Sequence, residues 1–212
     1  MSSLSFERFR LLASTRLRRD VPQPGDLIQR PRSDFDHQTT PVAMPDETSL
    51  KPAAVLVPII DRPGGATVLL TTRAASLRTH SGQIAFPGGR TDADDASPVD
   101  TALREAEEEI GLRRAHVTPL GYLDAYQTGT GFRIQPLVAL VQPPLNLALD
   151  PREVEAAFEV PLAFLMDPAN HQRHSRHWNG AERFFYAISH GERYIWGVTA
   201  GILRNLHERL YS

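Results

Sequence analysis

A capped amphipathic helix predicted at residues 97–111 is the feature that most constrains what this chain can fold into. Ser97 suits the N-cap, Pro98 the first helical position, and Gly111 the stop after the last turn. At about 100° per residue, the apolar side chains of the helix fall on one stripe: Ala102, Leu103, Ala106 and Ile110. Such a helix has to bury its stripe against another layer, so the rest of the chain must supply that layer.

Strand-like runs on both sides of the helix supply it. The apolar runs 53–60 and 66–72 flank the turn signal DRPGG and predict a hairpin, and a short strand is expected in 84–90, ending at Pro-Gly-Gly. Further strands are predicted at 116–126, 134–141, 153–161, 182–188 and 193–197, and further helices at 162–166 and 197–210. The polar stretch rich in His and Arg before residue 182 is expected to be loop-like. This order predicts an α+β fold, a mixed sheet with helices packed on it.

The first 51 residues are predicted to be an appendage to a domain formed by 52–212. A surface helix is expected near the N-terminus, with a ragged apolar face made of Leu4, Phe6, Phe9, Leu11 and Leu12. The proline-rich stretch 20–52 follows, which indicates an extended arm or linker rather than a second domain.

Charge and composition exclude several classes of protein. A formal net charge of −2 gives no overall attraction to nucleic acid or to an anionic membrane. The absence of cysteine excludes disulfides, thiolate metal sites and a Cys nucleophile. No stretch approaches the roughly 18 apolar residues of a membrane span. We therefore expect a cytoplasmic protein that binds neither nucleic acid nor a membrane, and a homodimer stays open.

The polar face of the predicted helix is acidic. With Glu105 at 0°, Glu109 lies near 40° and Glu108 near −60°, whereas Glu107 lies on the far side, near about 200°. Three carboxylates on one face repel one another, and Arg104 or a hard divalent cation such as Mg²⁺ would relieve that repulsion. From these residues alone, a metal platform and a solvated helix face are equally acceptable interpretations.

The segment REAEEEIGL at 104–112 matches REUxEExGU, the core of the Nudix box, in which U is aliphatic. The family's glycine loop corresponds to PGG at 87–89. In the full box, Gly89 is followed by Asp95 where the family has Glu, and eight residues rather than seven then lead to Arg104. The contribution of Asp95 is therefore open, whereas the metal-bearing end of the box is intact.

A second segment, LLTTRAASLRTHSGQIAFPGG at 69–89, resembles the additional signature LLTxRxxxxRxxxGxxxFPGG of the coenzyme A pyrophosphatase branch of that family. Arg73, Arg78, Gly82 and Phe86 fall in register with it. The segment YIWGVTAGIL near the C-terminus is also similar to that branch. The two long motifs lie within 69–112, and the resemblance at the level of the fold extends from about residue 52 to the C-terminus.

The resemblance implies a Nudix-type α/β/α sandwich that hydrolyses the diphosphate of coenzyme A or its thioesters, with Mg²⁺ or Mn²⁺ as cofactor. The products would be 3′,5′-ADP and 4′-phosphopantetheine or its acyl form. Glu105 and Glu109 would be the principal metal ligands, Glu108 a further ligand or the base that orients water, and Arg104 a member of the catalytic group.

Other residues are assigned around this centre. Gly88 and Gly89 would let the backbone approach the substrate, and Arg73 and Arg78 would either bind phosphate or pair with the acidic loop at 92–95. The family often draws a further ligand from a later loop, for which Glu153 and Glu155 are candidates. A histidine group is assigned to solvent or substrate rather than to Mg²⁺, a poor partner for imidazole: His171, His174 and His177.

Two alternatives remain at this stage. The same chemistry would serve another nucleoside diphosphate derivative, such as ADP-ribose. A Nudix-fold domain without catalysis, acting as a ligand sensor or RNA-binding regulator, is disfavoured because the acidic set is complete and the net charge is not basic.

Overall fold

The computed structural model describes residues 5–21, 32–33, 49–77, 79–178 and 181–212. Most of the proline-rich arm, Leu4 and Arg78 lie outside the described residues. The helices are α1 (Phe6–Arg16), α2 (Pro98–Ile110), α3 (Leu162–Leu165) and α4 (Gly197–Tyr211), with short 3₁₀ turns η2 (Arg114–His116) and η3 (Pro168–Asn170). No described helix is long and apolar enough to cross a membrane.

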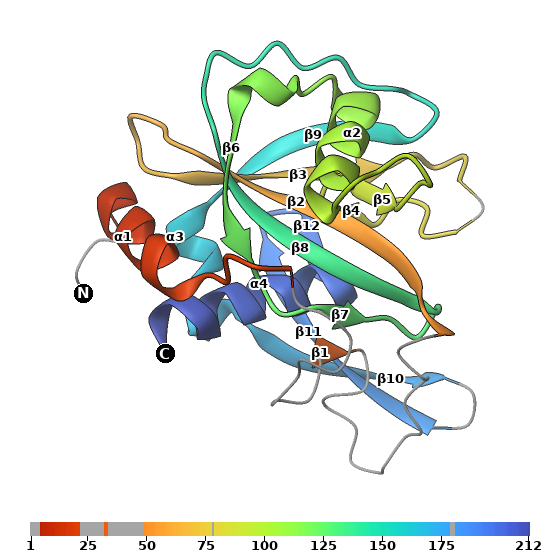
Figure 1. The fold of residues 1–212 in the computed structure, drawn as a ribbon. Coiled ribbons are helices and arrows are strands. Elements are labelled where there is room, and N and C mark those ends of the chain that lie inside the picture. Colours follow the sequence, from red (N-terminus) through yellow and green to blue (C-terminus); the bar gives the residue numbers. More distant parts are fainter. Residues whose placement is uncertain (1–4, 22–31, 34–48, 78, 179–180) are drawn as a thin grey trace.

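The strands form a large mixed sheet and a small antiparallel one (Figure 1). The large sheet has the order β1-β7-β8-β2-β3-β4, while β5 pairs with β2, β6 with β8 and β9 with β3. Its strands are β1 (Arg32–Ser33), β2 (Lys51–Ile60), β3 (Thr67–Arg73), β4 (Ile84–Ala85), β5 (Gly88–Arg90), β6 (Val117–Tyr122), β7 (Tyr126–Gln127), β8 (Phe132–Val141) and β9 (Val154–Pro161). The small sheet contains β10 (Gln172–Trp178), β11 (Ala181–His190) and β12 (Arg193–Trp196).

Strand β2 shows why the large sheet is covered on both faces. It pairs in parallel with β8 along its whole length and antiparallel with β3 at the predicted hairpin. Because side chains alternate along a strand, Leu56 enters one core and Val57 the other. The apolar stripe of α2 packs in the first core, and α1 and α4 pack in the second (Figure 1). The predicted α/β/α sandwich with a mixed sheet is therefore confirmed.

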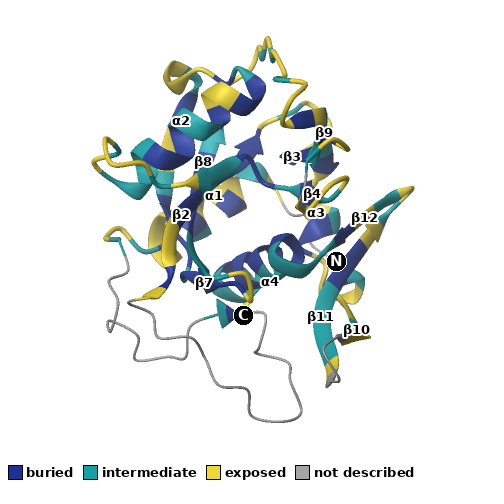
Figure 2. Ribbon diagram, turned by 90° about the vertical axis from the view of Figure 1, so that its right-hand side faces the viewer, coloured by how far each residue is buried: buried dark blue, intermediate teal, exposed yellow. Residues whose placement is uncertain are grey.

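Both predicted ends of α2 are confirmed. The Ser97 hydroxyl accepts a hydrogen bond from the Asp100 amide at 3.3 Å, and Gly111 takes the left-handed conformation with φ 66°. The buried residues of α2 include the whole predicted stripe, whereas Glu107 is exposed. Figure 2 shows buried and exposed stretches alternating along this helix. The helix is therefore rotated about its axis as the sequence predicted.

Two local predictions were wrong. The Gly-Gly pair at 88–89 does not end a strand; it begins β5, which pairs with β2 through Gly88 opposite Val55. The polar stretch that was expected to be loop-like contains β10, which pairs with β11 over seven registered positions. The N-terminal helix is present, but it is more than a surface element, because Phe9 and Ala13 are fully buried in the core.

Candidate active site

The acidic face of α2 lies against the glycine pair of β5. The Gly88 amide donates a hydrogen bond to Glu109 Oε2 at 3.1 Å. A Cβ at position 89 would lie 2.5 Å from Glu105 Oε1, so only glycine leaves room for that carboxylate in its present position. The two glycines therefore hold the backbone against both carboxylates. They also line a cavity, to whose lining α2 itself contributes no residue.

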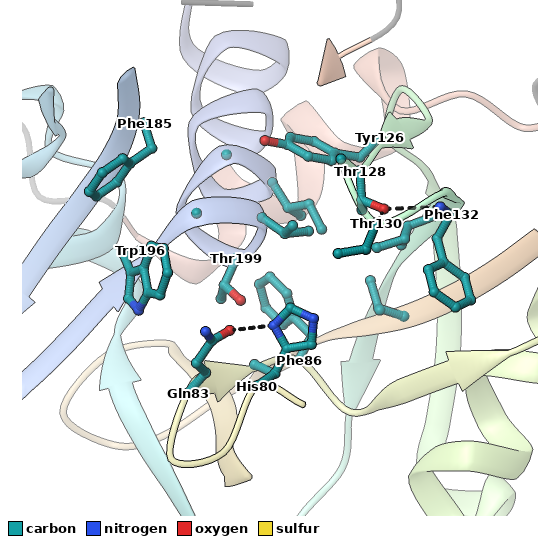
Figure 3. Close-up of a pocket in the computed structure, with 18 of the residues that line it drawn as sticks. His80, Gln83, Phe86, Tyr126, Thr128, Thr130, Phe132, Phe185, Trp196 and Thr199 are labelled. Atoms are coloured by element: carbon teal, nitrogen blue, oxygen red, sulfur yellow. Dashed lines mark hydrogen bonds between the residues drawn. The ribbon is translucent and has the colours of Figure 1, made fainter. Parts of the chain in front are cut away.

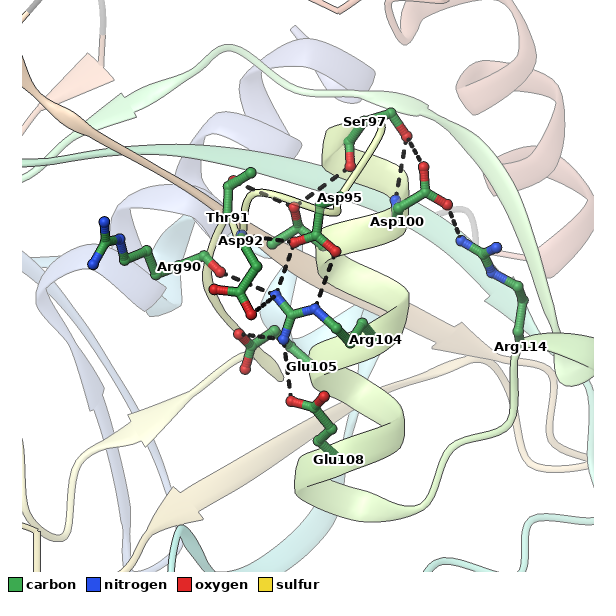
Figure 4. A network of polar contacts seen from close by, with 11 residues as sticks. Arg90, Thr91, Asp92, Asp95, Ser97, Asp100, Arg104, Glu105, Glu108 and Arg114 are labelled. Atoms are coloured by element: carbon green, nitrogen blue, oxygen red, sulfur yellow. Dashed lines mark hydrogen bonds and ion pairs between the residues drawn. The ribbon is translucent and has the colours of Figure 1, made fainter.

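Arg104 organises the outer part of the acidic face (Figure 4). Its Nε and Nη2 donate to the two oxygens of Asp95 at 3.0 and 2.8 Å, and its Nη1 donates to Glu105 at 3.0 Å and Glu108 at 3.1 Å. Hydrogen bonding to Arg104 holds the pKa of Asp95 well below its usual range, and the bond to Asp95 in turn raises the pKa of Arg104. Asp95, whose role the sequence left open, fixes the arginine that contacts Glu105 and Glu108 of α2.

Of the two innermost carboxylates, Glu109 is buried and Glu105 is partly buried. The side chain of Glu109 is 4% exposed, and burial raises its pKa to about 7, with a further contribution from the charge of Glu105. Burial also raises the pKa of Glu105, against the opposing effect of Arg104. Burial disfavours the ionised form of both carboxylates, so a cation bound to them would lower the free energy of the site.

Of the two candidates from the later part of the chain, Glu153 is the one whose charge acts on the acidic side chains of α2. Its negative charge is among the causes that raise the pKa of Glu105 and of Glu109. The turn that carries it is fixed at both sides: the Asp150 amide donates to the Glu109 carbonyl at 3.0 Å, and the Ala74 amide donates to the Glu153 carbonyl at 2.8 Å. Glu155 is exposed on β9 and contributes to neither shift.

The donor set fits a hard divalent cation. Within the described residues, no group of three or more His, Asp and Glu side chains is already arranged to hold a metal ion. Mg²⁺ does not need such a cage, since it is commonly held by one or two carboxylates together with waters and substrate phosphates. The oxygen donors of Glu105 and Glu109, with Glu108 beside them, match that preference.

Arg73 lies beside the innermost carboxylate. Its Nη1 is 3.8 Å from Glu109 Oε1, and its Nε is buried and has no hydrogen-bond partner among the described residues. Arg104, rather than Arg73, forms the ion pairs with Asp92 and Asp95 of the acidic loop. The buried N–H group of Arg73 is a donor that a bound phosphate oxygen would satisfy.

A cavity of about 820 Å³ is lined by Arg73, Gly88 and Gly89, among other residues. These three residues also lie against Glu105 or Glu109 of α2. Figure 3 shows Phe185 and Trp196 on one side of the cavity, Tyr126 and Phe132 on the opposite side, and Thr199 of α4 between them. Two segments gave a signal in the sequence: the signature at 69–89, which contributes Arg73, Phe86, Gly88 and Gly89, and the YIWG segment. The rest of the lining was missed, because it comes from strands and a helix far apart along the chain. Arg32 on β1 also reaches the cavity.

The three histidines assigned to solvent or substrate, His171, His174 and His177, lie in different surroundings. The expectation of solvent or substrate contact was wrong for His171, which is buried and 2.6 Å from the Leu165 carbonyl through Nε2. Burial lowers the pKa of His171, which favours its neutral form. His174 contacts the Tyr194 hydroxyl at 2.8 Å on the small sheet, and His177 is exposed.

Comparison with known proteins agrees with the fold and the acidic helix. The family model described as NUDIX domain matches residues 50–181. Proteins named "Uncharacterized Nudix hydrolase NudL" from Yersinia pestis (strain Pestoides F) and from Yersinia pseudotuberculosis serotype O:1b (strain IP 31758) are each 40% identical over 158 residues, covering 74% of this chain and 79% of the relative. The solved structure of RenU, a Nudix hydrolase from M. Smegmatis, is 27% identical with a TM-score of 0.46, covering 53% of this chain and 71% of that one.

The family model covers more than half of the chain, and the relatives are named as members of one class of hydrolases. The chain belongs to the Nudix family.

Proposed function

We propose that this chain hydrolyses the diphosphate bond of coenzyme A or its thioesters, giving 3′,5′-ADP and 4′-phosphopantetheine or its acyl form. The observation that carries the proposal is that one cavity joins the glycine strand, with the buried carboxylates directly behind it, to an aromatic wall. A ligand with a diphosphate in its middle and a nucleobase at one end matches that sequence of surfaces. The signature at 69–89 supports coenzyme A as the ligand.

In this proposal Glu105 and Glu109 hold Mg²⁺ or Mn²⁺, with Glu108 as a further ligand or as the group that orients the attacking water. The metal supplies charge neutralisation on the diphosphate and a lower pKa for bound water. Arg104 acts as a positioning residue, because it contacts Glu105 and Glu108 while Asp95 fixes its guanidinium.

The remaining site residues are proposed to contact the substrate or to add a metal ligand. Arg73 donates its unpaired Nε–H to the diphosphate, and the backbone of Gly88 and Gly89 forms the adjoining surface. Glu153 is the favoured additional ligand, because its charge acts on both Glu105 and Glu109; Glu155 is the weaker candidate. Arg78 stays a proposed phosphate contact.

We keep the proposed division into a helix and arm at 1–51 and a hydrolase domain at 52–212, in which α1 of the first segment packs in a core of the second. Arg32, which belongs to the proposed arm, lines the cavity. This position supports a role for the arm in contacting the substrate.

A panel of diphosphates incubated with Mg²⁺ or Mn²⁺ tests the proposal. We expect coenzyme A and a short acyl-coenzyme A to be cleaved to the products named above, identified by mass, and ADP-ribose and dinucleoside polyphosphates to react at least tenfold more slowly. Glu109→Gln protein, assayed in parallel, excludes a contaminating hydrolase. Faster cleavage of ADP-ribose, or no cleavage of coenzyme A with either metal, would overturn the substrate assignment.

A further inference from the structure

Residues of five neighbouring strands form one row across a face of the large sheet. Ala53 on β2 is registered with Arg90 on β5 and with Ile134 on β8. Ile134 is in turn registered with Tyr126 on β7, which pairs with Arg32 on β1. Registered residues on adjacent strands share a face of the sheet, and all five of these residues line the cavity. The row is therefore a continuous floor of the cavity that begins at the glycine strand.

The middle of this floor carries no charge. Ala53, Ile134 and Tyr126 lie between the arginines at its two ends. Val55 also lines the cavity, and it is registered with Gly88. Since neighbouring strands are about 4.8 Å apart, β5 and β7 are about 14 Å apart across β2 and β8. The floor therefore suits an uncharged, extended arm of about four residue lengths.

Helix α4 forms the opposite side of the same space. Val198, Gly201 and Ile202 all line the cavity, and their i, i+3, i+4 spacing places them on one face of the helix. The Thr199 hydroxyl donates to the Ile84 carbonyl at 2.9 Å, which fixes the start of the helix against β4. The arm of a ligand on the floor would therefore lie between the sheet and an apolar helix face.

Tyr126 closes one end of this space, because its ring reaches from the sheet to the helix (Figure 3). A Cβ at position 201 would lie 2.6 Å from Tyr126 Cε2 and 2.8 Å from its hydroxyl oxygen, so the ring lies directly against the backbone of α4. Gly201 does not have a positive φ, and glycine inside a helix costs about 1 kcal/mol relative to alanine. The glycine is therefore explained by the space that the tyrosine ring needs.

We propose that this floor binds the uncharged arm that follows the diphosphate, and that Tyr126, seated on Gly201, is the specificity-determining residue for the group at the end of that arm. The proposal rests on the proposed function for the position of the diphosphate, beside Gly88 and Gly89. The pantetheine portion of coenzyme A is such an arm and ends in the thiol that carries an acyl group. Because the Tyr126 ring spans the space between β7 and α4, a free thiol or a short thioester fits, whereas a longer acyl chain meets the ring.

Calorimetric titration in the presence of EDTA tests the proposal without turnover. Three ligands are compared: coenzyme A, hexanoyl-coenzyme A, and adenosine 3′-phosphate 5′-diphosphate, which lacks only the arm. Wild type should bind coenzyme A about tenfold or more tightly than either of the other two, since burial of a few methylene groups of the arm accounts for a change of that size.

Two variants should act in opposite directions on the end of the floor. Tyr126→Leu opens it, so hexanoyl-coenzyme A should bind this variant about tenfold more tightly than it binds wild type. Gly201→Ala pushes the ring over the floor, so coenzyme A should bind about tenfold more weakly while the affinity for the arm-free nucleotide changes by less than about twofold. In the double variant, which has no ring to displace, coenzyme A should bind as it binds Tyr126→Leu. Gly64→Ala is the matched control, because a Cβ there meets no atom within 4 Å and Gly64 does not line the cavity.

Far-ultraviolet circular dichroism and the melting temperature establish that each variant is folded. An equal loss of coenzyme A and of the arm-free nucleotide in Gly201→Ala would mean that the methyl group distorts α4 as a whole, and would overturn the proposal. The proposal is also wrong if Tyr126→Leu still rejects hexanoyl-coenzyme A, or if wild type does not distinguish coenzyme A from the arm-free nucleotide.

Turnover in the presence of Mg²⁺ distinguishes this failure from failure of the proposed function. If the ligands bind as expected but coenzyme A is not cleaved, the assignment of the floor stands and the proposed reaction is wrong. If coenzyme A is cleaved and Tyr126→Leu changes kcat/KM for coenzyme A and for hexanoyl-coenzyme A by the same factor, the reaction stands and the role of Tyr126 is wrong.

Discussion

The buried carboxylate of Glu109 makes a prediction that can be tested without knowing the substrate. Replacing Glu109 with Gln preserves the shape of the side chain and lets an amide oxygen accept the Gly88 hydrogen bond. The substitution removes a negative charge that burial makes costly. We expect Glu109→Gln to abolish turnover, because a metal ligand is lost, and to stabilise the metal-free protein at the same time.

The size of that stabilisation follows from the pKa. Burial raises the pKa of Glu109 from 4.5 to about 7, and one pKa unit corresponds to about 1.36 kcal/mol. Ionising this side chain therefore costs the folded, metal-free protein roughly 3 kcal/mol at pH 8. Because the folded-state pKa is the higher one, the free energy of unfolding of wild type falls as pH rises from about 4.5 through 7. The amide in the variant also faces Arg73, so we expect a net gain of about 1–3 kcal/mol at pH 8 that vanishes near pH 4.5.

Urea denaturation in the presence of EDTA at pH 5 and pH 8 measures this difference directly. A matched control is Glu107→Gln, which removes the same charge from the exposed side of α2. Adding Mg²⁺ should raise the stability of wild type, by binding only the folded state, and leave Glu109→Gln nearly unchanged. A variant with the same stability relative to wild type at both pH values would refute the buried-charge argument. A variant that retains more than about a tenth of wild-type turnover, an effect below roughly 1.4 kcal/mol, would refute the metal assignment.

Three further outcomes are expected. Glu107→Gln should change kcat/KM by less than about twofold, as Glu107 points away from the acidic face; a loss like that of Glu109→Gln would mean that the helix is rotated from its described position. Asp95→Asn should lower the free energy of unfolding by about 2 kcal/mol in urea denaturation, because Arg104 loses a bidentate ionic partner. Arg73→Ala should reduce kcat/KM on coenzyme A and on 3′-dephospho-coenzyme A by the same factor, since Arg73 lies beside Glu109; selective loss on coenzyme A would instead make it the reader of the 3′-phosphate.

The parts of the fold that the sequence predicted depend on local signals. Helix α2 has a capping serine, a proline in its first turn, a glycine stop and an apolar stripe with helical period, and each of these acts within a few residues. The β2–β3 hairpin likewise has apolar runs joined by a Pro-Gly-Gly turn. Neither prediction needs knowledge of distant contacts.

The parts that were missed are specified by contacts across the chain. The sequence of strand β10 shows no alternation of apolar residues. Its side chains pack instead through arginine–aromatic contacts: Arg173 Cζ lies 4.1 Å from the centroid of the Phe184 ring, and Arg176 packs on Trp196. Strand β5 has the glycine-rich composition of a turn. Its glycines are required, however, by the close approach of β2 and α2. The acidic face was predictable from the helical period. The contacts of Gly88 and Arg73 with Glu109, and the electrostatic effect of Glu153 on that face, depend on the tertiary fold.

The two adjacent glycines of β5 provide a final prediction, because they are glycine for different reasons. Gly88 has φ 151°, and a Cβ there would lie 2.4 Å from the Ala54 carbonyl oxygen, which belongs to the backbone of the paired strand. A Cβ at Gly89 would instead lie 2.5 Å from a carboxylate oxygen of Glu105, the end of a side chain that can rotate away. Gly88→Ala should therefore disrupt the sheet, whereas Gly89→Ala should displace one proposed metal ligand.

The two substitutions should separate stability from activity. We expect Gly88→Ala to lower the free energy of unfolding by more than about 2 kcal/mol, as backbone strain and overpacking act together. We expect Gly89→Ala to lower it by less than about 1 kcal/mol and yet to reduce turnover at least tenfold, because Glu105 leaves the position in which Arg104 holds it. Raising the Mg²⁺ concentration should partly restore Gly89→Ala, since the lost ligand weakens metal binding. If Gly89→Ala is as active as wild type at low Mg²⁺ concentration, the position of Glu105 does not matter for catalysis and its assignment as a ligand is wrong.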